Sequence, residues 1–497
     1  MTKKSKKINL FSFSHNRNDS YEIAAKKIFK VVNSYTDQIE FNSFFLYFKK
    51  RYELPESVIK QSLRQYIVRS YLMRSGKFDP KLKINKIPVS IIRYSALIYG
   101  LFFSKLQKKY KNIDLIIDYI TSTIEMYRWE KLINLFGANK VICVTRELNI
   151  KKEFPNYNFE IQKKFQNFNF FDLIKSIFNE VFFGIWIVLK VSIKTNTNLF
   201  PISLSIINSY LSSKSLFQNY KANFLIQEKH YNTEPVKNYI FKKYGGLVST
   251  SIQKNIIALE PIFFYLDLDI LFSLGNGGYR RAINYGGRID LIQPVGSLFL
   301  ERGWFDKSFK IKKKYDVAIL GINTSNAYER LDSFNKFMED HYSLYRWAAK
   351  LSIENPKLKI VVIHHSSAGE DKIHDEILSK SNVKVLDKNS NSYEIAFSSN
   401  CAVTYGSTMG YELNAHGLPT YFVDPGFRCI FLPRRGDSCI ENMRISTYDS
   451  FKSVINSYIS KDNKKFQIIN SDEICLNSSN VSRNIYNFFQ DINQNKI

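Results

Sequence analysis

One segment, residues 400–426, limits the possible fold more than any other part of the chain. It reads NCAVTYGSTMGYELNAHGLPTYFVDPG. The apolar run 401–404 suits a parallel strand covered on both faces, and the run 420–423 predicts a second strand of the same kind. Between them, Gly406 turns the chain into a short helix that ends at Gly417. The segment therefore predicts a βαβ unit of an open parallel sheet.

The start of this short helix has the properties of an anion-binding site. Ser407 or Thr408 can cap the helix, so that backbone N–H groups and the positive end of the helix dipole face outward. Gly410 and Glu412 follow within the helix. An ordinary strand–turn–helix that binds nothing is the alternative interpretation.

The pattern Gly-Ser-Thr-x-Gly-x-Glu at 406–412, followed by Gly-x-Pro at 417–419, resembles the donor-side motif of GT-B glycosyltransferases and related nucleotide-sugar enzymes. Capsule transferases, teichoic acid glycerophosphate polymerases and hydrolysing sugar 2-epimerases carry versions of it. The resemblance implies an α/β fold of two Rossmann-like domains, with this motif in the second. It also implies that Ser407 and Thr408 contact phosphate and that Glu412 holds ribose or a sugar hydroxyl, with Gly406 and Gly410 in the same site.

A second buried-strand pattern, KLKIVVIH at 357–364, ends in His364 and His365. Ligands collect at the carboxyl ends of parallel strands. The resembled capsule transferases often have His-Pro here, with the histidine at the donor phosphate, whereas His365 is followed by Ser366. Either histidine can therefore be the equivalent, His365 is also a candidate catalytic residue, and a solvated pair of loop histidines is the alternative.

A third strand, 315–321, opens this domain and precedes a polar loop and a long amphipathic helix at about 327–354. Asn323 and Thr324 in the loop are candidates for lining the ligand cleft, or they are simple helix caps. A short strand at 383–386 and a helix at 392–398 complete the βαβα order.

The length of 497 residues suits two or three domains. We predict a first domain at 1–307, a linker at 308–314, a nucleotide-sugar domain at 315–460 and a C-terminal tail or helix at 461–497. The first domain contains five strand-like runs alternating with helical stretches, at 113–120, 140–145, 222–226, 246–251 and 269–274. It also contains a largely helical region at 15–110 and a helical insertion at about 165–220.

In a GT-B enzyme the first domain supplies the acceptor side and the catalytic base. Such a base must lie within hydrogen-bond reach of the sugar hydroxyl that it deprotonates. Glu228 and His230 follow the strand 222–226 and are candidates, as is Asp118. A solvated loop position is the alternative for each. The Gln-His-Gly turn of the resembled enzymes is reduced to Gln253 here, because Lys254 and Asn255 follow it.

The most apolar run, VFFGIWIVL at 181–189, spans about nine residues, whereas a membrane-spanning helix needs about twenty. It is therefore predicted not to cross a membrane. A buried core helix and an in-plane membrane contact both remain open for it.

The chain has 71 Lys and Arg against 45 Asp and Glu, a formal charge of +26. Such an excess favours an anionic membrane or an acidic glycan as a partner, although composition typical of an AT-rich genome would raise lysine as well. No nucleic-acid-binding motif accompanies the charge, so we expect no nucleic acid. The five scattered cysteines and the lack of a signal-peptide pattern favour the cytoplasm, possibly at the inner face of the plasma membrane.

These features together predict a metal-independent GT-B-like glycosyltransferase. It would move a sugar from a nucleotide-activated donor to a cell-surface polysaccharide or lipid-linked glycan, with the donor as substrate and no separate cofactor. The alternatives are a nucleotide-sugar 2-epimerase and a noncatalytic assembly factor that binds glycan or membrane. The missing His-Pro and Gln-His-Gly residues favour the assembly factor.

Overall fold

A computed structural model describes most of the chain. The described residues are 29–69, 87–102, 111–161, 178, 180–228, 233–255, 265–277, 286–303, 311–322, 334–365, 372–387, 390–427, 429, 443–459 and 471–494.

The first domain is built on a parallel sheet with the strand order β3-β2-β1-β4-β5-β6-β7. Its two central strands are almost wholly buried, as expected for apolar runs with helices on both faces. The strands are β1 (Lys111–Ile120), β2 (Val141–Thr145), β3 (Phe159–Ile161), β4 (Tyr220–Gln227), β5 (Val248–Ile252), β6 (Asp267–Ser273) and β7 (Arg288–Pro294).

Short helices connect these strands. The helix α6 begins where the Ser122 hydroxyl accepts a hydrogen bond from the Glu125 N–H at 3.2 Å, and it ends at Gly137, whose φ of +90° suits glycine. The connecting elements are α6 (Thr123–Phe136), η4 (Ala138–Lys140), α7 (Leu148–Glu153), α11 (Pro235–Lys243) and α13 (Leu298–Gly303).

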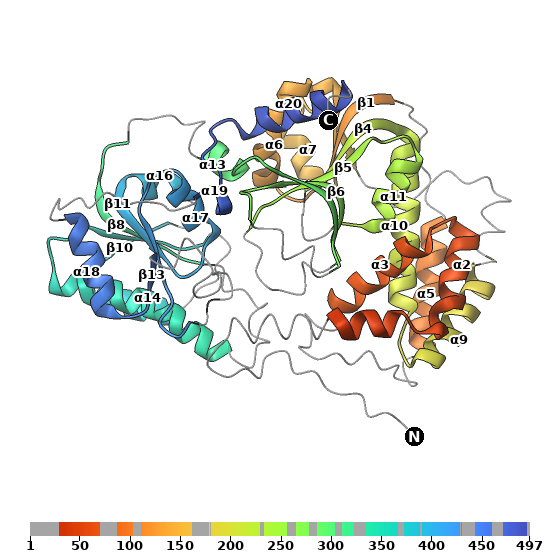
Figure 1. The fold of residues 1–497 in the computed structure, drawn as a ribbon, viewed down its shortest axis with the longest axis horizontal. Coiled ribbons are helices and arrows are strands. Elements are labelled where there is room, and N and C mark those ends of the chain that lie inside the picture. Colours follow the sequence, from red (N-terminus) through yellow and green to blue (C-terminus); the bar gives the residue numbers. More distant parts are fainter. Residues whose placement is uncertain are drawn as a thin grey trace.

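A helical bundle packs beside this sheet (Figure 1). Two segments far apart in sequence form it, the region before β1 and the region before β4, and they share one aromatic-rich core. Buried Glu180 joins them, because its carboxylate accepts hydrogen bonds from the Tyr47 hydroxyl and from Arg51 Nε. The bundle contains η1 (Ile39–Phe41), α2 (Asn42–Tyr52), α3 (Glu56–Ile67), α5 (Ile87–Phe102), the π-helical turn η5 (Glu180–Gly184), α9 (Ile185–Thr195) and α10 (Phe200–Asn219).

The second domain repeats the plan with the strand order β10-β9-β8-β11-β12-β13, again all parallel. Its strands are β8 (Tyr315–Leu320), β9 (Ile360–Ile363), β10 (Lys384–Leu386), β11 (Ser399–Thr404), β12 (Thr420–Val423) and β13 (Arg444–Ile445). Its helices are α14 (Phe334–Glu354), α15 (Lys372–Ser379), α16 (Ser392–Phe397), α17 (Thr408–Ala415) and α18 (Tyr448–Ile459).

The end of the chain returns to the first domain (Figure 1). After α19 (Ser471–Ile474), helix α20 (Val481–Asn493) packs against α6. Phe489 is fully buried there and stacks on Phe224 of β4 with ring centroids 4.2 Å apart. Two sheets with the Rossmann order, joined in this way, confirm the predicted GT-B-like fold class.

The apolar run 181–189 divides between two environments. Val188 is buried in the bundle core, whereas Phe182, Phe183 and Trp186 are exposed. The prediction of a buried core helix therefore fits only one side of this segment. None of the helices in the described residues combines the length and apolarity needed to cross a bilayer.

Substituting Phe489→Ala should destabilise the first domain by about 3–5 kcal/mol, because it removes a fully buried ring and leaves a cavity. Urea unfolding followed by fluorescence measures this change. The matched control, Asn487→Ala, changes an exposed residue of the same helix and should have little effect. Equal stability of the two variants would contradict the packing described for α20.

Candidate functional site

Both sheets have a topological switch point, the position at which the strand order reverses. It lies between β1 and β4 in the first domain and between β8 and β11 in the second. In open α/β sheets, ligands bind outside the carboxyl ends of the strands at this position. The residues that follow β4 and β11 are therefore the first to consider.

In the second domain, three strand ends bring the predicted donor residues together. Gly321 follows β8, His364 and His365 follow the neighbouring β9, and Gly406 follows β11 on the other side. A Cβ atom on Gly321 would lie 3.3 Å from both the His364 Cα and the His365 backbone nitrogen. Glycine at 321 thus lets the β9 end approach closely.

Ser407 is the N-cap of α17. Its hydroxyl accepts a hydrogen bond from the Met409 N–H at 3.3 Å, and its own N–H donates to the Thr404 hydroxyl at 3.3 Å. Thr408 is the first residue of the helix and is partly exposed. The structure therefore places Gly406, Ser407 and Thr408 as the sequence predicts, at a helix N-terminus beside a switch point.

Gly410 has a packing role that the sequence did not reveal. It is buried, and a Cβ atom there would lie 2.9 Å from Thr404 Cγ2 and 2.9 Å from the ring of Phe422. Glycine at this position allows α17 to lie close against β11 and β12.

Glu412 is also buried, and its carboxylate has two protein partners. The Ser297 hydroxyl, just before α13, donates to one oxygen, and the Tyr393 hydroxyl of α16 donates to the other at 2.6 Å. Burial raises the pKa of Glu412, while these two hydrogen bonds and the positive charge of Arg128 act in the opposite direction. Because Ser297 and Arg128 belong to the first domain, Glu412 lies where the two domains meet.

His364 belongs to a cluster of histidines and tyrosines beside the end of β9. Its ring stacks on that of His374 with the ring centroids 5.5 Å apart, and the ring centroids of Tyr345 and His374 are 4.1 Å apart. His341 of α14 is completely buried, and its ring centroid lies 5.2 Å from that of His374. The two ring nitrogens of His341 have no hydrogen-bond partner among the described residues. Burial lowers the pKa of His341 and of His365, so both favour the neutral form.

In the first domain, Glu228 follows β4 and is completely buried. Its carboxylate pairs with the Lys254 ammonium group, which follows β5, and with Arg128 Nη1 of α6 at 3.3 Å. Lys254 also lies 3.3 Å from Glu125 Oε1. Burial raises the pKa of Glu228 and lowers that of Lys254.

Arg128 connects the parts of the candidate site that belong to the first and the second domain. Its guanidinium group lies 3.7 Å from the ring centroid of Phe299, two residues after Ser297, and its charge acts on Glu412 across the domain boundary. The second acidic candidate, Asp118, pairs with Lys237 Nζ at 2.6 Å.

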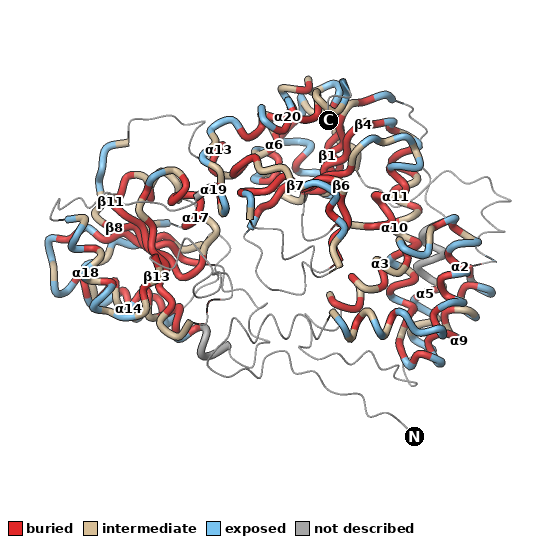
Figure 2. Tube along the Cα trace, viewed as in Figure 1, coloured by how far each residue is buried: buried red, intermediate tan, exposed pale blue. Residues whose placement is uncertain are grey.

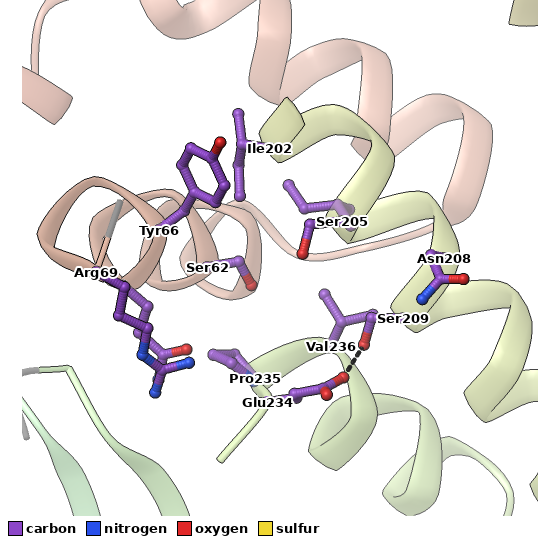
Figure 3. A pocket seen from close by; sticks show the side chains of 12 residues that line it. Ser62, Tyr66, Arg69, Ile202, Ser205, Asn208, Ser209, Glu234, Pro235 and Val236 are labelled. Carbon is purple, nitrogen blue, oxygen red and sulfur yellow. Dashed lines mark hydrogen bonds between the residues drawn. The ribbon is translucent and has the colours of Figure 1, made fainter. Parts of the chain in front are cut away.

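A polar pocket of about 260 Å³ lies beside this half of the site, between α3, α10 and the start of α11 (Figure 3). Glu234 and Arg69 face it, and the Ser209 hydroxyl donates to the Glu234 carboxylate at 2.6 Å. Burial lowers the pKa of Arg69 to about 10, and the negative charge of Glu234 opposes that shift. Hydroxyl and amide groups of Ser62, Ser205 and Asn208 give the lining further hydrogen-bonding capacity.

Three predicted site residues, His230, Asn323 and Thr324, lie outside the described residues. Four contributors were missed from sequence: Arg128, Lys254, Tyr393 and His374. Of these, only Lys254 has a signal in the sequence, its place just after a strand of the sheet, although it departs from the Gln-His-Gly motif. Within the described part of the chain, no group of three or more His, Cys, Asp or Glu side chains is arranged to hold a metal ion.

No family model and no curated protein matches the sequence. Among solved structures, the S. aureus MnaA–UDP co-structure is similar over 77% of this chain and 97% of that one, with 11% identity and a TM-score of 0.46. UDP-GlcNAc 2-epimerase from Neisseria meningitidis bound to UDP-GlcNAc is similar over 76% of this chain and 100% of that one, with 10% identity and a TM-score of 0.45. The wall teichoic acid polymerase TagF is similar over 84% of this chain and 99% of that one, with 11% identity and a TM-score of 0.42. At these values the likenesses carry no conclusion about a reaction or substrate of this chain.

Substituting Glu412→Gln should change how stability depends on pH. A carboxyl group whose pKa is raised in the folded state adds most to the free energy of unfolding below its unfolded-state pKa. This stabilisation is lost as the pH rises through the folded-state pKa. The glutamine variant lacks this loss, so its melting temperature relative to wild type should be higher at pH 8 than at pH 4.5. Glu376→Gln, at an exposed position of α15, is the matched control and should give a constant difference. A constant difference for Glu412→Gln as well would contradict the raised pKa.

Proposed function

We propose that the chain is a GT-B-like glycosyltransferase that uses a nucleotide-activated sugar to extend a cell-surface polysaccharide or lipid-linked glycan. One observation carries this proposal. The Gly-Ser-Thr turn that resembles a donor motif occurs at the switch point of the second sheet, and a buried acid–base group occurs at the switch point of the first.

The second domain would bind the donor. The hydroxyls of Ser407 and Thr408 and the N-terminus of α17 would contact its phosphates, with His364 or His365 on the adjacent strand end. As the bond to the sugar breaks, negative charge develops on the departing nucleotide. The helix dipole and oriented N–H groups would stabilise that charge, which requires neither a metal ion nor a separate cofactor.

The first domain would bind the acceptor. Glu228 would serve as the base, since burial raises its pKa and makes the carboxylate a stronger base. Lys254 and Arg128 would hold the carboxylate in position. The polar pocket beside Glu234 offers hydroxyl and amide groups suited to a glycan.

A nucleotide-sugar 2-epimerase is the second candidate. It is favoured by the concentration of Asp118, Glu125 and Glu228 at one switch point, because removing and returning a proton at carbon requires an acid and a base. Incubation with the donor alone separates the two functions. An epimerase changes the sugar without an acceptor, whereas a transferase requires one.

We place the reaction in the cytoplasm. Cys143 and Cys401 are buried and form no disulfide, which suits a reducing compartment.

The first test is thermal melting in the presence of CMP, CDP, UDP, GDP and their sugar conjugates. A nucleotide at about one hundred times its Kd should stabilise the fold by about 2.7 kcal/mol. The variant Ser407→Ala/Thr408→Ala should lose this shift. Ser379→Ala/Ser381→Ala removes two hydroxyls at and just after the C-terminus of α15, before β10 begins, and should keep the shift. No shift with any nucleotide for the folded wild type would reject both enzymes in favour of the noncatalytic assembly factor.

The second test concerns the base. Glu228→Gln should lower the transfer rate by about 100- to 10,000-fold and leave the donor-induced melting shift unchanged. Glu301→Gln is the matched control, because Glu301 is also buried and ion-paired, with Lys131, but lies outside the proposed acid–base group. Both variants are first melted without ligand to compare their folding. A Glu228→Gln enzyme that folds and keeps its rate excludes this residue as the base.

A further inference from the structure

Helix α9 lies at the outer edge of the helical bundle and is partly exposed (Figure 2), and exposed apolar side chains follow η5 and α9. Phe182 and Phe183 are each 60% exposed, Trp186 is 63% exposed and Ile193 is 60% exposed. The opposite side of α9 is buried and includes Val188 and Val191. The helix is therefore packed on one side, while large apolar groups cover the side that faces water.

We call the exposed apolar residues of η5 and α9 the aromatic face; they are Phe182, Phe183, Trp186 and Ile193. An exposed apolar surface of this kind is characteristic of an interaction site.

Charge distinguishes the possible occupants. Lys190 and Lys194 lie in the same exposed stripe of α9. The sequences of η5 and α9 contain a single acidic residue, Glu180, which is buried and paired with Arg51. Within these two elements, the exposed charges beside the aromatic face are therefore positive.

We propose that the aromatic face docks the protein on the surface of an anionic lipid bilayer. A helix with aromatic and aliphatic residues on one side and lysines at its border lies in the plane of the membrane, with the rings at the level of the lipid headgroups. The lysine side chains extend toward lipid phosphates. Pairing with a second copy is disfavoured, because it would bring two sets of uncompensated cations together.

This inference depends on the surface alone and not on the proposed sugar transfer. If both hold, the acceptor-side domain is the one held at the membrane, since the bundle shares its core with that domain. A lipid-linked glycan would then be within the reach of an enzyme that has no membrane-spanning helix in its described residues.

The test is sedimentation of the full chain with vesicles of phosphatidylcholine mixed with phosphatidylglycerol, and of phosphatidylcholine alone. We expect binding to the mixed vesicles that weakens with salt. Phe182→Ala/Trp186→Ala should lower this binding by about tenfold or more. Lys190→Gln/Lys194→Gln should lower it by about fivefold for each lysine.

Leu148→Ala/Ile353→Ala is the matched control, because both side chains are 57% exposed and lie outside the aromatic face. This control and the Ser407→Ala/Thr408→Ala variant should bind vesicles like wild type, which separates the present proposal from the donor site. Unchanged binding of the Phe182/Trp186 variant would overturn the proposal. The proposal would also be overturned if wild type formed an oligomer, this variant were a monomer, and neither protein bound vesicles.

Discussion

A buried carboxylate needs cations beside it, and Glu228 imposes this requirement on the first domain. An uncompensated charge in the interior costs several kcal/mol, so the structure must supply partners from other elements. Lys254 comes from the end of β5 and Arg128 from the first turns of α6. The positions of β4, β5 and α6 relative to one another are thus fixed by charge as well as by apolar packing.

The same arginine extends this requirement across the domain boundary. Its charge acts on Glu412, which is buried with hydroxyl partners from α16 and from the segment before α13. A cation of the first domain therefore acts on a buried carboxyl group of the second, and the Ser297 hydrogen bond links the same two domains.

The local parts of this architecture could be predicted from sequence, whereas the assembled parts could not. The strands β1, β2, β4, β5 and β6 and the βαβ unit around Ser407 follow from apolar runs bounded by turns, and the structure has them close to the predicted places. β3, β7 and β13 were not predicted, because they are short or less buried edge strands. Glu228 was selected because it follows a strand, but Arg128 and Tyr393 reach the site from helix faces, and only the packing of α6 and α16 determines where those faces point. The bundle was also unpredictable as a unit, because its core joins segments separated by more than one strand of the sheet.

The return of α20 to the first domain has a consequence for biosynthesis. Ile485, Phe488 and Phe489 belong to the same apolar core as Phe224 and Phe272, although they are made after the second domain. The first domain emerges from the ribosome with part of its core missing and remains incomplete while the entire second domain is synthesised. The usual order, in which the N-terminal domain folds first and the next domain follows, cannot be completed here. A chain that stops before α20 would leave apolar surface of the first domain exposed, although the second domain is the one synthesised later.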